Sequence, residues 1–138
     1  MRAVLDVNVL VSAALSPNGS PARLVEAWQA GRFDLIVSAR LLDELSRALA
    51  YPKIRRHILA QDAADLVEWL SRAAVVVDDP VGDPPIRSVD PGDDYLIRLA
   101  AAADALLVSG DAHLLTLRPT LPIYSPADFL TLVDSEEA

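Results

Sequence analysis

One apolar run near the N-terminus constrains the fold of this 138-residue chain more than any other stretch. Residues 3–15 are almost entirely Val, Leu and Ala, and the run is interrupted by Asp6 and Asn8. A strand that is apolar on both faces is typical of the centre of a parallel sheet, because helices cover both faces there. Burying an unpaired carboxylate is costly. We therefore expect Asp6 at or near the carboxyl end of this strand, in the crevice where open α/β sheets bind ligands.

Composition limits the classes of protein to consider. An apolar content of 52% predicts one domain with its own core, and the lack of cysteine excludes disulfide bonds and cysteine-ligated zinc. The N-terminal run carries an acid and is followed by no convincing cleavage site, so we do not interpret it as a signal peptide. No apolar run approaches membrane-spanning length. We expect a cytoplasmic protein that does not associate with membranes.

Strand and helix patterns alternate along the rest of the chain. Serines before apolar-periodic segments predict helix starts at Ser20, Ser38 and Ser125. Short apolar runs predict further strands at residues 33–37, 73–77, 105–109 and 122–125. This alternation predicts a three-layer α/β/α sandwich around a central parallel sheet, which is a Rossmann-like architecture.

The domain is expected to span residues 1–133, and residues 134–138 are expected to form a solvated acidic tail. Inside the domain, residues 78–92 are rich in proline and contain two glycines, which argues against a regular element. Long loops of this kind are often functional. This one ends immediately before the acid pair Asp93 and Asp94.

Helical periodicity separates the acids that face inward from those that face solvent. At about 100° per residue, Glu44 lies at the border of the apolar stripe of its helix, whereas Asp43 points nearly opposite. In the helix that follows the long loop, Asp93 lies close to the direction of the large apolar residues and Asp94 does not. Asp93 is therefore the preferred candidate for the inward-facing acid, and Asp94 is the alternative. Asp111 follows a predicted strand and is expected at the same sheet edge as Asp6.

Four acids from four separate elements are thus candidates for one cluster. Carboxylates that lie close together repel one another unless cations neutralise them, and Mg²⁺ and Mn²⁺ prefer oxygen ligands. Each acid outside the first strand also has a simpler reading, because Asp93 or Asp94 could cap a helix, Glu44 could be solvated, and Asp111 could form a turn. Asp6 lacks such an alternative.

The segments around these acids resemble the signature blocks of the PIN-domain family, specifically its toxin branch from toxin–antitoxin systems, similar to VapC. The blocks are Val4–Val11, Leu42–Leu45, Asp90–Leu96 and Val108–Leu115. The resemblance covers nearly the whole chain and implies that Asp6, Glu44, Asp93 and Asp111 bind Mg²⁺ or Mn²⁺ and hydrolyse RNA. It also implies supporting roles for Asn8, which matches the asparagine that steadies the first aspartate, for Ser109, which stands where threonine is frequent, and for Asp94.

The resemblance implies a divalent-metal-dependent endoribonuclease with water as the nucleophile. Its implied partners are RNA, a cognate antitoxin protein and a second copy in a homodimer. The formal charge of −8 has the wrong sign for binding RNA by counterion release alone, so contacts to phosphate must be local. The candidates for these contacts are Arg40, Lys53, Arg55 and Arg56.

Three other classes of protein share part of this pattern. A response-regulator receiver needs a lysine after its last strands, but the only lysine is Lys53, in the other half of the chain. A haloacid-dehalogenase-type phosphatase needs a second aspartate two positions after the first, where this chain has Asn8. The serious alternative is a catalytically silent PIN-fold module that binds RNA or protein, because its acids could be intact while the path for RNA is blocked.

Overall fold

A parallel sheet forms the centre of the computed structural model, which describes residues 1–88, 91–118 and 120–136. Within these ranges the sheet has five strands in the order β3-β2-β1-β4-β5. The strands are β1 (Arg2–Leu5), β2 (Asp34–Val37), β3 (Val75–Val76), β4 (Leu106–Val108) and β5 (Ile123–Tyr124). The first strand is therefore the central one, as the apolar N-terminal run predicts.

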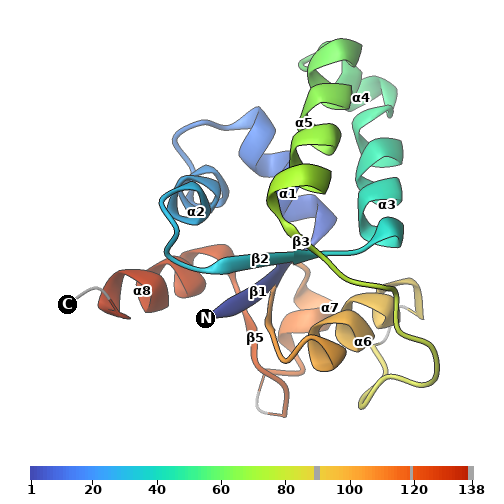
Figure 1. The fold of residues 1–138 in the computed structure, drawn as a ribbon, viewed down its shortest axis with the longest axis vertical. Helices are drawn as coiled ribbons and strands as arrows, with labels where there is room; N and C mark the ends of the chain where they lie inside the picture. The colour runs from blue at the N-terminus through green and yellow to red at the C-terminus, as the bar shows by residue number, and fades with distance from the viewer. Residues whose placement is uncertain (89–90, 119, 137–138) are drawn as a thin grey trace.

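Helices cover both faces of the sheet. They are α1 (Val7–Leu15), α2 (Ser20–Gln29), α3 (Ala39–Leu49), α4 (Pro52–Arg55), α5 (Ala60–Ala73), α6 (Asp94–Ala102), α7 (Ala112–Leu115) and α8 (Pro126–Glu136). In Figure 1, α1, α2, α3 and α5 lie on one side of the sheet, and α6 and α7 lie on the other. This arrangement confirms the predicted three-layer α/β/α sandwich. In the described ranges, no helix has the length and apolar character needed to cross a membrane.

The N-terminal apolar run is divided between two elements rather than forming strand alone. Ala3, Val4 and Leu5 are fully buried in β1, the chain turns at Asp6, and the remainder of the run forms α1. Helix α1 packs against α2 and α3, so it is apolar around most of its circumference. A short buried helix and a buried strand have the same continuous apolar pattern, which is why sequence alone did not separate them.

One other local prediction was wrong, and one helix is longer than predicted. Residues 73–77 were expected to form a buried strand, but β3 is an edge strand in which Val75 is 42% and Val76 is 52% exposed. The last helix was expected to end at about residue 133, before a solvated acidic tail; α8 continues to Glu136, and residues 134–136 are exposed. Asp134 in that last turn forms a 3.0 Å ion pair with Arg32. Residues 137–138 lie outside the described residues.

Serine capping explains where two helices begin. The Oγ atom of Ser38 accepts a hydrogen bond from the Leu41 amide at 3.3 Å, and Ser125 Oγ accepts one from the Asp128 amide at 3.1 Å. The third predicted cap was wrong, because Ser20 is the first residue of α2 and Gly19 occupies the capping position. The Ser38 cap sets the start of α3, which carries Glu44.

Candidate functional site

Asp6 lies between the two central strands at the carboxyl end of the sheet. It follows β1 directly, and its backbone amide donates a 2.9 Å hydrogen bond to the Val108 carbonyl at the end of β4. The strand order reverses at this point, because the chain continues from β1 to β2 on one side and β4 lies on the other. In open α/β sheets such a switch point forms the ligand-binding crevice. Asp6 thus stands where the sequence places it.

The carboxylate of Asp6 is nearly inaccessible, with 5% of the residue exposed. Burial raises its pKa because the charged form loses hydration, and the negative charge of Asp111 raises it further. The hydroxyl of Ser109 opposes this shift by donating a 2.7 Å hydrogen bond to Asp6 Oδ2, and the backbone amides of Asn8 and Val7 also favour the charged form. The pKa is raised overall, so the folded chain holds this negative charge at a cost.

Three of the four predicted acids line one cavity at this edge. The cavity has a volume of about 250 Å³. Asp6 comes from the end of β1, Glu44 from α3, and Asp93 from the short 3₁₀ helix Pro91–Asp93. The remaining lining residues are Val7, Asn8, Arg47, Ala48, Tyr51, Tyr95 and Leu96. We call this cavity the acidic pocket.

Asp111 lines a neighbouring pocket instead. Its carboxylate caps α7 by accepting a 2.8 Å hydrogen bond from the His113 amide, and its own amide donates to Ser109 Oγ at 3.0 Å. Asn8 lines both pockets, so the two adjoin. The single hydroxyl of Ser109 therefore contacts Asp6 and also orients the turn that carries Asp111.

The adjacent acids Asp93 and Asp94 face different surroundings. Asp94 is buried and accepts hydrogen bonds from the Ser88 amide at 2.7 Å and from Arg87 Nη1 at 3.3 Å. It thereby ties the end of the long loop to the first turn of α6. Asp93 lines the acidic pocket. Asp93 is thus the member of the pair that lines the acidic pocket, and its role as a cation ligand stays a prediction.

Glu44 is held by arginines of its own helix. Its Oε1 atom lies 4.0 Å from Arg40 Nε and 3.8 Å from Arg47 Nη2. In the part of the chain that the structure describes, no three acidic, histidine or cysteine side chains lie close enough together to hold a metal ion. The oxygen donors of Asp6, Glu44 and Asp93 are nevertheless the kind that hard divalent cations prefer, and a cation would offset the buried charge of Asp6, whose pKa is raised mainly by desolvation. The donor chemistry therefore fits Mg²⁺ or Mn²⁺.

The four predicted phosphate contacts are not equivalent. The guanidinium of Arg40 lies 4.3 Å from the centre of the Tyr95 ring, at the border of the acidic pocket. None of the four is among the residues that line the acidic pocket, but Arg40 lies beside two that do, Glu44 and Tyr95. Lys53, Arg55 and Arg56 belong to α4 and the residue after it. Arg40 is thus the member of the set that the structure brings to the acids.

Sequence reasoning did not single out Tyr95 or Arg47. Tyr95 is 4% exposed, and burial together with the charges of Glu44 and Asp6 raises the pKa of its hydroxyl. Its position beside the Asp93–Asp94 pair was a usable signal, since a large aromatic residue at the start of a helix next to an inward-facing acid is placed to reach the same cavity. Arg47 follows Glu44 by three positions, which puts the two side chains on the same helix face.

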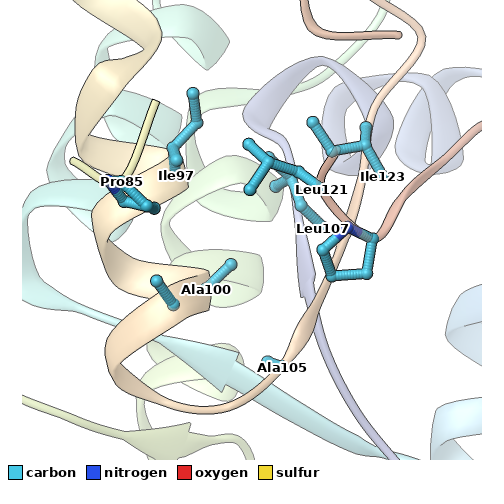
Figure 2. Close-up of a pocket in the computed structure, with 9 residues that line it drawn as sticks. Pro85, Ile97, Ala100, Ala105, Leu107, Leu121 and Ile123 are labelled. Atoms are coloured by element: carbon cyan, nitrogen blue, oxygen red, sulfur yellow. The ribbon is translucent and has the colours of Figure 1, made fainter. Parts of the chain in front are cut away.

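A second cavity, of about 50 Å³, lies between α6 and the strands β4 and β5. Figure 2 shows its side chains, with Ile97 and Ala100 of α6 facing Leu107 and Ile123 of the strands. All of its lining residues among those described are apolar or proline. It offers no group that could donate a proton, hold a cation or act as a nucleophile, so it does not compete with the acidic pocket as the site of chemistry.

Several known proteins are similar to this chain in sequence or in fold. The uncharacterized protein MJ1680 of Methanocaldococcus jannaschii is 24% identical over 119 residues, which cover 86% of this chain and 76% of that protein. Among solved structures, PAE2754 from Pyrobaculum aerophilum has a TM-score of 0.65 and 16% identity, and the match covers 98% of this chain and 90% of that one.

A chain in the structure of VapBC2 from Rickettsia felis, bound to a DNA fragment from their promoter, has a TM-score of 0.63 and 15% identity. That match covers 91% of this chain and 98% of the Rickettsia chain. Identities this low establish a common fold. The PIN domain model matches residues 2–113, a range that contains all four candidate acids. The chain therefore belongs to the PIN domain family.

Proposed function

We propose that this protein is a divalent-metal-dependent endoribonuclease that hydrolyses phosphodiester bonds of RNA. The observation that carries the proposal is the acidic pocket, in which Asp6, Glu44 and Asp93 reach one cavity from three elements at the switch point of the sheet. Asp111 stands beside it across Asn8. Membership of the PIN domain family supports a nuclease-type activity at these acids.

Asp6, Glu44, Asp93 and Asp111 would hold Mg²⁺ or Mn²⁺. Such an ion, when bound, makes water a stronger acid and offsets negative charge at the phosphorus centre. Ser109 fixes Asp6 by its 2.7 Å hydrogen bond, and Asp94 fixes the loop before Asp93 through the Ser88 amide. The first contact holds Asp6 in place before substrate arrives, and the second ties the neighbour of Asp93 to the long loop, so less ordering is required at the time of reaction.

We further propose that the protein acts as the toxin of a toxin–antitoxin pair, with a cognate antitoxin as partner and a homodimer as the assembly. The likeness of its fold to a chain of VapBC2 supports this assignment. The alternative is a catalytically silent PIN-fold module that binds RNA or protein. One observation favours the alternative: the Glu44 carboxylate lies within ion-pair distance of Arg40 and Arg47, so its charge is partly balanced without a cation.

A cleavage assay with end-labelled single-stranded RNA distinguishes the ribonuclease from the catalytically silent module. The purified protein should cleave it with Mg²⁺ or Mn²⁺, lose activity with EDTA and regain it when the ion is restored. Ca²⁺ should not substitute, because the larger ion holds its ligands loosely and polarises water less. Cleavage that persists in EDTA, or at full rate in Asp6→Asn, would indicate another nuclease or another mechanism. RNA binding without cleavage under any metal condition would favour the silent module.

A further inference from the structure

Arg40, on the first turn of α3, lies beside two residues that line the acidic pocket, Glu44 and Tyr95. Its backbone amide donates a 3.0 Å hydrogen bond to Asp79 Oδ2, which fixes the main chain at this position. The side chain is 44% exposed, and its guanidinium rests over the face of the Tyr95 ring. Among the described residues, no acceptor takes a hydrogen bond from this guanidinium, because its closest carboxylate oxygen, on Glu44, is 4.0 Å away. Its N–H groups thus remain available to a ligand.

Arg47 lies at the same pocket but differs in this respect. Its Nη2 atom is 2.7 Å from Asp43 Oδ2 and 3.8 Å from Glu44 Oε1. The Arg47 guanidinium is therefore already hydrogen-bonded within α3. Arg40 is the arginine that can present charge and donors to an anion at the acidic pocket.

Tyr95 gives Arg40 its position. The ring is almost completely buried in the first turn of α6, so it cannot move readily, and it presents a flat face to the guanidinium. A guanidinium stacked on an aromatic face gains a cation–π attraction. Its N–H groups point outward in the plane of the guanidinium and so stay free to donate hydrogen bonds. A long flexible side chain loses rotamer freedom when it binds a ligand, and stacking removes part of that loss beforehand.

Building on the ribonuclease function proposed above, we propose that Tyr95 is a positioning residue whose ring holds Arg40 ready to bind a non-bridging phosphate oxygen of the RNA backbone beside the acidic pocket. An acidic pocket repels phosphate, and the chain as a whole is acidic, so one preorganised cation at the border has a large effect on substrate binding. The planar guanidinium suits a phosphate because it can donate two parallel hydrogen bonds.

The test is a double-mutant cycle on RNA binding. Fluorescence anisotropy with a labelled single-stranded RNA and Mg²⁺ is measured in an Asp6→Asn background, in which cleavage is blocked. Arg40→Ala should weaken binding by about tenfold, the effect of losing one charge-assisted phosphate contact. Tyr95→Leu should weaken RNA binding to a similar degree, and the double variant should bind RNA no more weakly than either single variant. Tyr95→Phe keeps the ring and should recover most of the affinity that Tyr95→Leu loses.

Salt dependence distinguishes positioning from a merely structural role. Loss of one phosphate contact should reduce the slope of log K against log salt by about 0.7, in both Arg40→Ala and Tyr95→Leu. The control is Arg23→Ala, which removes one charge from α2, outside the acidic pocket, and should leave the contribution of Arg40 intact. Circular dichroism melting of each variant confirms that it is folded.

Each outcome decides one hypothesis. If the parent binds RNA but the effects of Arg40→Ala and Tyr95→Leu multiply in the double variant, Tyr95 acts independently of Arg40 and the inference is overturned, while the proposed function stands. If the Asp6→Asn parent binds no RNA, both the inference and the proposed function are wrong. If Tyr95→Leu does not fold, Arg40→Lys replaces it: this variant keeps the charge but lacks the planar group that stacks, so it should lose most of the affinity that Arg40→Ala loses. Full affinity in Arg40→Lys would overturn the inference.

Discussion

Ser109 joins the two central strands at the candidate site by donating a 2.7 Å hydrogen bond to Asp6 Oδ2. Both residues are buried, and Ser109 Oγ also accepts the backbone amide of Asp111 at 3.0 Å. One hydroxyl therefore satisfies a buried carboxylate that follows β1 and holds the turn after β4. The relative positions of two of the four candidate acids depend on this atom.

Replacing Ser109 by alanine should affect both stability and cleavage. The variant leaves the buried Asp6 carboxylate and the Asp111 amide without their shared partner, which should reduce the free energy of unfolding by about 1–3 kcal/mol. Ser109→Thr keeps the hydroxyl and is the matched control, with a smaller loss expected in urea denaturation and in RNA cleavage. Equal losses in the two variants would show that the volume of the side chain, rather than the hydrogen bond, matters at this position.

The raised pKa of Asp6 predicts how its amide variant behaves with pH in metal-free protein. Above the ordinary aspartate pKa of about 4, the folded state binds this proton more tightly than the unfolded state, so the free energy of unfolding falls as pH rises through the window up to the folded pKa. Asp6→Asn removes this penalty. Its melting temperature at pH 7 should equal or exceed that of the wild type, and the advantage should shrink as pH is lowered towards 4.

The opposite result would have a clear meaning. A large loss of melting temperature in Asp6→Asn at pH 7 would show that the contacts of the carboxylate with Ser109 and with the backbone amides of Val7 and Asn8 outweigh its desolvation. Asp6 would then be a structural acid. Thermal melts of both proteins in EDTA at several pH values provide the measurement.

Sequence reasoning placed Asp6 correctly because a single acid in an apolar run is tolerated only at the end of a buried strand. In the structure Asp93 lines the pocket, whereas Asp94, which helical periodicity directs away from the apolar stripe, is buried against the long loop. Their chemical roles remain predictions. The division of the N-terminal run into β1 and α1 was not predictable, because continuous apolar sequence has no period that distinguishes the two.

Most features of the site that could not be predicted from the sequence are contacts between separate elements. Tyr95 and Arg40 lie 55 positions apart in the sequence, and their stacking depends on how α6 and α3 meet at the sheet edge. The placement of Asp111 beside the acidic pocket, rather than inside it, similarly depends on the turn that Ser109 holds. Periodicity within one element carries no information on either relationship.

Glu44 and Asp43 form a matched pair for testing the acids of α3. Glu44 lines the acidic pocket, whereas Asp43 is exposed and pairs with Arg47 at 2.7 Å. Glu44→Gln should lower the rate of metal-dependent RNA cleavage by about a hundredfold or more, because a proposed cation ligand loses its charge. Asp43→Asn should change it little. Rates measured under single-turnover conditions check this, and equal losses in the two variants would point to a general effect of charge on α3.

Substitutions at Asp93 and at Asp94 should have different effects, the first on metal binding and the second on stability. Asp94 accepts the buried Ser88 amide at 2.7 Å, so Asp94→Ala leaves that amide unpaired and should lower the free energy of unfolding by about 1–3 kcal/mol. Asp94→Asn keeps an oxygen acceptor and should lose less. Asp93→Asn should instead weaken Mn²⁺ binding in isothermal titration calorimetry and abolish cleavage, because its carboxylate lines the acidic pocket. If Asp94→Asn rather than Asp93→Asn removed Mn²⁺ binding, the third ligand would be Asp94, and the loop that it holds would have to open for the ion to bind.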